Sequence, residues 1–232
     1  MNIILIAGLW LDGSAWDDVV PPLVERGHRP VPLTLPGQGE SATSATLEDQ
    51  VAAVVAAVDG AETGPAVVVG HSAAATLAWL AADARPDQVG AAVLIGGFPT
   101  TDGEAYAAFF DLVDGVMPFP GWGPFEGADI ADLDQATRNR VAASAHAVPG
   151  GVASGVVRYA DERRRDVPLT LICPEFTPAE ARAWIDAGDL PELASARRLD
   201  LVDLDSGHWP MFSRPGELAG LLADVADRVR GA

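Results

Sequence analysis

The chain has 232 residues, and its 33 acidic and 15 basic side chains give it a formal charge of −18 at pH 7. So acidic a chain lacks the basic face that phosphate binding needs, which argues against nucleic acid, an anionic membrane surface and strongly anionic substrates as partners. Hydrophobic residues make up 49% of the chain, enough to form a core, so a disordered acidic protein is excluded and one large α/β domain is expected.

The apolar N-terminus is expected to form the first strand. Residues 1–7 have no positive residue ahead of their short apolar run, whereas a secretory signal would begin with one. No stretch approaches the roughly 20 apolar residues of a membrane span. The one cysteine, Cys173, excludes an internal disulfide. These features predict a cytoplasmic protein.

Short β-branched or leucine-rich runs alternate with alanine-rich stretches, which is the pattern of a parallel α/β sheet covered by helices. Strands are predicted over residues 3–7, 30–35, 66–70, 91–95, 169–173 and 199–204. Helices are predicted over residues 16–26, 46–58, 73–84, 178–186 and 215–230. At the start of the second helix, Thr46 and Asp49 stand three apart and predict a capping box.

The alternation breaks over residues 100–160, where no strand is predicted and helical patches surround a turn-rich stretch. An insertion of this size between two strands is expected to form a helical lid on a single α/β domain, 1–232, whose core is 1–99 and 161–232. Aromatic side chains in the insertion either line an apolar pocket or pack the lid against the sheet. They include Tyr106, Phe109, Phe110, Phe119, Trp122 and Phe125.

The strongest local signal for chemistry is Ser72, which follows a buried strand and precedes a helix. A sharp turn there lifts the serine oxygen clear of the sheet and points it at backbone amides that can stabilise an oxyanion. Small residues must flank such a turn. Gly70 is one of them, and Ala74 stands where the G-x-S-x-G pattern has its second glycine. The alternative is a serine that only caps the helix.

A serine hydroxyl is a poor nucleophile without a base, and the chain has four histidines. His71, next to Ser72, is expected to point away around the elbow. His28 precedes a strand at the far end of the sheet, and His146 lies in the insertion. His208 follows the last strand, so it is expected at the same carboxyl edge as Ser72 and is predicted to be the base. An exposed loop histidine is the alternative.

The carboxylate that orients the histidine is expected between serine and histidine in the chain, as in hydrolases. Glu175 follows the strand over 169–173, and Asp102 follows the preceding strand as the second candidate. Asp203 and Asp205 are too close to the histidine in sequence to reach behind its ring. For Glu175 and Asp102 alike, an ordinary surface carboxylate remains the alternative.

Over nearly its whole length the chain resembles the α/β-hydrolase superfamily, because four features occur in that family's order. They are the first strand running into Ala7-Gly8-Leu9-Trp10, the turn from Leu35 to Ser41, the elbow at Ser72, and Gly207-His208. Residues 10–16, 96–99 and 207–215 also resemble the branch that contains plant methylesterases and hydroxynitrile lyases.

The resemblance implies an oxyanion hole made by the backbone N–H groups of Leu9 and Ala73, and substrate contacts from Trp10, Phe98 and Trp209. One departure concerns the loop before Leu9, where the family commonly has His-Gly and this chain has Ala7-Gly8. The lost histidine usually supports that loop.

These residues predict a serine hydrolase for a carboxylic ester, thioester or lactone with an apolar portion, working as a monomer or homodimer. No cofactor or metal is expected, since the histidines are too scattered for a metal site and Gly37-Gln38-Gly39 lacks the third glycine of a dinucleotide fingerprint. Two other classes stay open. One is a lyase or cofactor-free oxygenase that uses the same triad for proton abstraction, and the other is a ligand-binding relative with incidental hydrolysis.

Overall fold

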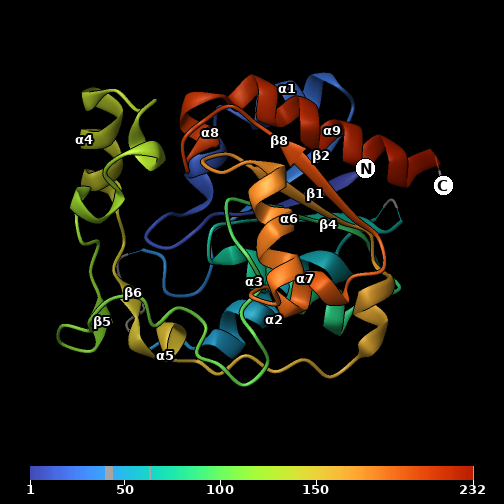
Figure 1. The fold of residues 1–232 in the computed structure, drawn as a ribbon, viewed down its shortest axis with the longest axis horizontal. Coiled ribbons are helices and arrows are strands. Elements are labelled where there is room, and N and C mark those ends of the chain that lie inside the picture. Colours follow the sequence, from blue (N-terminus) through green and yellow to red (C-terminus); the bar gives the residue numbers. More distant parts are fainter. Residues whose placement is uncertain (40–43, 63, 232) are drawn as a thin grey trace.

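The computed structural model describes residues 1–39, 44–62 and 64–231. Glu40 and Ser41, at the end of the predicted turn, lie outside the described residues. The described chain contains a six-stranded parallel sheet with the order β2-β1-β3-β4-β7-β8 (Figure 1). Its strands are β1 (Asn2–Ile6), β2 (Arg29–Leu33), β3 (Ala66–His71), β4 (Val89–Ile95), β7 (Leu169–Cys173) and β8 (Leu199–Asp203). Each lies within two residues of its predicted bounds.

Helices cover both faces of the sheet. The α-helices are α1 (Val20–Glu25), α2 (Leu47–Asp59), α3 (Ala74–Ala84), α4 (Gln135–Ser144), α5 (Gly150–Ala153), α6 (Pro178–Ala187), α7 (Pro191–Ser195), α8 (Pro210–Ser213) and α9 (Pro215–Gly231). Short 3₁₀ helices are η1 (Gly13–Trp16), η2 (Gly123–Phe125), η3 (Ala128–Ile130) and η4 (Glu162–Asp166). None of the described helices is both long enough and apolar enough to cross a membrane.

The sheet separates two apolar clusters, which follow from the alternation of side chains along each strand. Ile4 and Ile6 of β1 belong to one cluster with buried residues of α2, α3, α6 and α7, whereas Ile3 and Leu5 belong to the other, with residues of α1, α8 and α9. Figure 1 shows these two sets of helices on opposite sides of the strands. Because both faces are covered, the central strands read as continuous apolar runs.

The first predicted helix differs from the structure. The expected helix over 16–26 is shortened to α1, which begins at Val20, and its first expected residue, Trp16, is the last residue of η1. Pro21 and Pro22 have no backbone N–H to donate, so they fit only the first turn of a helix and set its start. At α2 the prediction is confirmed, since Thr46 and Asp49 form the capping box.

The insertion over 100–160, drawn in green to yellow in Figure 1, contains strands that the sequence did not predict. β5 (Val116–Met117) and β6 (Val148–Pro149) pair antiparallel. Two-residue strands this far apart in the chain have no local periodicity, and their pairing depends on how the insertion folds back on itself. The expectation of a strand-free insertion was therefore wrong.

Candidate active site

The turn between β3 and α3 holds Ser72 in a conformation that few non-glycine residues adopt. Its φ is 55°, in the left-handed region, and its N–H donates to the Ile95 carbonyl at 2.8 Å. α3 begins two residues later, at Ala74. A strained serine on a strand-to-helix turn is the geometry of a nucleophile elbow.

Replacing Gly70 with alanine is expected to destabilise the protein severely. A Cβ at Gly70 would lie 2.1 Å from the Ala74 carbonyl oxygen, a backbone atom in the first turn of α3 that cannot rotate away. Overpacking of this kind costs about 1–3 kcal/mol or more, which thermal unfolding would detect. The control is Gly220→Ala, whose Cβ would meet nothing nearer than 3.9 Å and which should be as stable as the wild type or more so. Equal unfolding temperatures for the two variants would contradict this.

The structure brings Ser72, His208 and Glu175 together at the carboxyl edge of the sheet. Ser72 Oγ lies 2.9 Å from His208 Nε2, and His208 Nδ1 lies 2.6 Å from Glu175 Oε1. Ser72 follows β3, His208 follows β8 and Glu175 follows β7. These strands are parallel, so their carboxyl ends lie at the same edge of the sheet. In such an arrangement the imidazole can take the hydroxyl proton while the carboxylate holds the other ring nitrogen.

Both partners of this histidine–carboxylate contact are largely removed from water, with the side chains of His208 and Glu175 14% and 15% exposed. Glu175 Oε2 is buried and has no hydrogen-bond partner among the described residues. Asp102, the second candidate, lies elsewhere, because its Oδ1 accepts the Tyr159 N–H at 2.9 Å. Of the two carboxylates, Glu175 is the one in contact with the histidine.

His71 was expected to point away from the site, and this expectation was wrong. Its Nε2–H donates to the His208 carbonyl at 2.8 Å, and the two rings are 5.0 Å apart. Burial, followed by the charge that His208 can carry, lowers the pKa of His71 to about 3. The imidazole is therefore neutral at ordinary pH and holds the His208 backbone. The sequence offered one signal that His71 lies at the site, namely its position immediately before Ser72.

Two backbone amides beside Ser72 are free to bind a ligand. Within the described residues, neither the Leu9 nor the Ala73 N–H donates a hydrogen bond. Ala73 follows the serine directly, and Gly8 brings the Leu9 loop close, since a Cβ on Gly8 would be 3.0 Å from Ser72 Cβ. Uncommitted amides at this place are suited to an oxyanion.

A cleft of about 450 Å³ opens onto Ser72. One wall contains Phe98, Phe176 and Trp184, whose ring centroids are 5.2–5.9 Å apart. The insertion contributes further lining residues, including the exposed ring of Phe109. Phe98, which the family resemblance singled out for substrate contact, is thus among the residues that line the cleft at Ser72. Phe176 and Trp184 were missed, although Phe176 directly follows Glu175 at the same sheet edge.

The sequence matches the model of the alpha/beta hydrolase family over residues 3–221. This chain belongs to that family. Lipase LipV of Mycobacterium tuberculosis is 28% identical to this hydrolase over 246 residues, which cover 95% of this chain and 91% of the lipase. Methylesterase 7 of Arabidopsis thaliana is 23% identical over 255 residues, which cover 98% of this chain and 96% of that protein.

Solved structures share the fold. An extracellular alpha/beta-hydrolase from a Paenibacillus species has a TM-score of 0.77 at 16% identity, and the alignment covers 97% of this chain and 98% of that protein. Methylesterase MES16 from Arabidopsis has a TM-score of 0.76 at 14% identity, and the alignment covers 98% of this chain and 99% of that protein. The expected α/β-hydrolase fold is confirmed, and the methylesterases agree with the expected branch.

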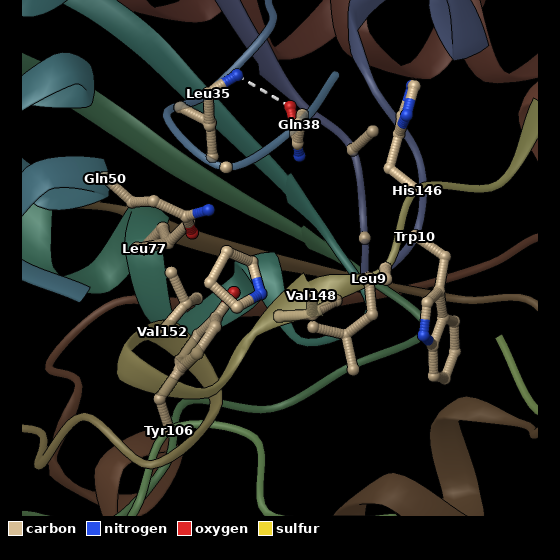
Figure 2. Close-up of a pocket in the computed structure, with 15 residues that line it drawn as sticks. Leu9, Trp10, Leu35, Gln38, Gln50, Leu77, Tyr106, His146, Val148 and Val152 are labelled. Atoms are coloured by element: carbon tan, nitrogen blue, oxygen red, sulfur yellow. Dashed lines mark hydrogen bonds between the residues drawn. The ribbon is translucent and has the colours of Figure 1, made fainter. Parts of the chain in front are cut away.

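Trp10 lies outside the hydrolase's cleft at Ser72. Its indole N–H donates to the Met117 carbonyl, and its ring packs against Phe110, Phe119 and Phe125. With Leu9 it lines a separate cavity of only about 20 Å³. Figure 2 shows this cavity, with Gln38 and Gln50 on one side and Leu9, Val148 and Tyr106 on the other. At this size it admits about one water molecule.

Trp209 is buried behind the site rather than in the cleft. Its ring packs on the His208 ring, with centroids 4.7 Å apart, and on Trp122 and Phe125. Most aromatic side chains of the insertion therefore pack with one another and with Trp10 or Trp209, and Phe109 is the one that lines the cleft.

The remaining histidines lie apart from Ser72. His28 accepts from Arg230 at the N-terminal end of β2, and His146 lies 2.9 Å from Asp12. In the described part of the chain, no three His, Cys, Asp or Glu side chains gather closely enough to hold a metal ion.

Proposed function

We propose that this chain is a serine hydrolase that cleaves a carboxylic ester, thioester or lactone with an apolar portion. The observation that carries the proposal is the continuous contact from Ser72 Oγ through the His208 ring to Glu175. Relatives named as a lipase and a methylesterase, aligned over most of the chain, support ester bonds as the target.

The mechanism starts with proton transfer from Ser72 to His208 Nε2 as the serine oxygen attacks the substrate carbonyl. Glu175 holds Nδ1–H and stabilises the imidazolium that forms. The tetrahedral oxyanion accepts hydrogen bonds from the Leu9 and Ala73 amides. The imidazolium then protonates the leaving alcohol, thiol or, in a lactone, the ring oxygen. Water, deprotonated by His208, hydrolyses the acyl-enzyme and regenerates Ser72.

The cleft favours an uncharged, apolar substrate. Its three-ring wall offers apolar surface, and the charged residues that line it are Glu104 and Glu175, with no arginine among the described lining residues. Carboxylates repel an anionic substrate. Thr101, Glu104 and Phe109 of the insertion form part of the lining, which supports a lid role for residues 100–160.

Trp184→Ala is expected to reduce hydrolysis of long acyl esters selectively. The variant removes one side of the apolar wall, and contacts of this kind change specificity by about 1–3 kcal/mol, or about 10–200-fold. We expect kcat/KM for p-nitrophenyl octanoate to fall by about 10-fold or more, while the value for p-nitrophenyl acetate stays within about twofold. The acetate serves as the internal control for folding and for the reactivity of Ser72. An equal loss on both esters would contradict a wall at Trp184.

The proposed reaction is tested by trapping its intermediate. Wild-type protein mixed with a p-nitrophenyl ester should release a burst of p-nitrophenol, and rapid acid quenching should give a peptide in which Ser72 carries the acyl group. Turnover of a carbonyl substrate with no acyl adduct on Ser72 would contradict the mechanism and favour proton abstraction by the same residues.

A further inference from the structure

The loop that carries His208 is held by residues of the insertion. The His208 N–H donates to the Asp129 carbonyl at 2.8 Å, and the Gly207 N–H donates to Asp132 Oδ2 at 2.8 Å. We infer that Asp132 is a positioning residue for the general base, because it fixes the backbone from which the imidazole reaches Ser72. This inference rests on the proposed hydrolase function.

The contact between the two segments is too close for any side chain at position 207. A Cβ on Gly207 would lie 2.3 Å from the Asp129 carbonyl oxygen and 2.5 Å from Asp132 Oδ1. The glycine therefore lets the insertion pack directly on the backbone of the His208 loop. A sequence-based search looks for groups that touch substrate, so it had no reason to single out Asp132.

The turn that presents Asp132 is itself anchored. Ile130 and Leu133, on either side, are 7% and 4% exposed and belong to the same apolar cluster as Trp209 and Met211. The Asp132 carboxylate is thus presented from an anchored backbone. The His208 loop that it binds continues into Trp209 and Met211, which pack in the same apolar cluster.

One oxygen of Asp132 is in an unfavourable environment for folding. Its Oδ1 is buried and has no hydrogen-bond partner in the part of the chain that the structure describes. A buried carboxylate oxygen without a hydrogen-bond partner opposes folding, so the contribution of Asp132 is expected in the geometry of the His208 loop rather than in stability.

Four hydrogen bonds then define the position of the base. His71 donates to the His208 carbonyl and Glu175 accepts from His208 Nδ1. The Asp129 carbonyl accepts the His208 N–H, and Asp132 accepts the Gly207 N–H. The Asp129 carboxyl is a further charge near the ring, and burial, with repulsion from Glu175, raises its pKa. Because several carboxyl groups face His208, the inference is tested by rates and by a conservative variant rather than by a pH profile alone.

The experiment compares Asp132→Ala, Asp132→Asn and Asp134→Ala in kinetics on p-nitrophenyl acetate. Loss of the Gly207 contact should lower kcat by about 10–100-fold with KM within about twofold, since small misplacements of a catalytic group cost up to about 10²-fold. Asparagine keeps an oxygen that can accept the Gly207 N–H, so Asp132→Asn should recover most of the lost rate. Asp134 caps α4 through the Thr137 N–H, away from the His208 loop, so Asp134→Ala should keep kcat within about twofold.

A second readout separates this inference from the proposed function. The rate of fluorophosphonate labelling at Ser72 needs no substrate and should fall in Asp132→Ala in parallel with kcat. Unchanged labelling and kcat in Asp132→Ala, or equal losses in Asp132→Ala and Asp134→Ala, would overturn the positioning role while leaving the hydrolase intact. No labelling of folded wild-type protein would overturn both. Should Asp132→Ala fail to fold, Asp132→Ser, whose hydroxyl is too short to reach Gly207, takes its place with the same expected losses.

Discussion

Ser72→Ala is expected to lower kcat for ester hydrolysis by about 10⁴–10⁶-fold, the range seen when the nucleophile of a serine triad is removed. The loss is expected because Ser72 Oγ is the hydroxyl in contact with His208 Nε2, so the substitution removes the group that would form the acyl-enzyme. Steady-state kinetics on p-nitrophenyl acetate measure the effect.

His208→Ala is the companion variant, because the serine and its base act as one unit. Removing either should cost about as much as removing both, so the double variant is expected to match the single ones rather than to multiply their losses. His146→Ala, which removes a histidine bound to Asp12 instead, is the control and should retain nearly full activity. Activity in Ser72→Ala within 10-fold of the wild type would contradict the assignment.

Glu175→Gln is expected to reduce kcat by about 10⁴-fold although it preserves the size of the side chain. The carboxylate accepts Nδ1–H and so leaves Nε2 free to take the Ser72 proton. An amide can donate to Nδ1 instead, which favours the tautomer with its proton on Nε2, facing the serine. The variant should fold normally and show its loss in kcat.

Asp102→Asn is the matched control for Glu175→Gln. Both exchanges replace a carboxylate by an amide at the carboxyl edge of the sheet, but the Asp102 oxygen accepts a backbone N–H of Tyr159, which an amide oxygen can also do. Kinetics should therefore show a change of no more than about twofold. A greater loss in Asp102→Asn than in Glu175→Gln would reverse the choice between the two carboxylates.

The positions of Ser72, Glu175 and His208 could be predicted because they depend only on where parallel strands end. Each follows a run of buried apolar residues, and strand ends meet at one edge of the sheet whatever the packing around them. His71 was misplaced because adjacent residues on a tight elbow do not obey the alternation of a strand. Its ring turns toward the His208 carbonyl instead.

The walls of the site could not be predicted in the same way. Trp10 and Trp209 stand at family-like positions, yet they are held by rings of the insertion, whose fold depends on contacts such as the two-residue pairing of β5 with β6. Asp132 has no local signal at all, because its proposed role depends on a hydrogen bond to a residue 75 positions away. Such contacts are tertiary, and composition or periodicity does not encode them.

The most direct test of Ser72 as an activated nucleophile is fluorophosphonate labelling, with the adduct located by peptide mass spectrometry. Wild-type protein should be labelled at Ser72, Ser72→Ala should not be labelled, and His208→Ala should react far more slowly, because the hydroxyl is reactive only beside its base. Folded wild-type protein that takes up no label, or takes it up at a residue other than Ser72, would contradict the proposed hydrolase.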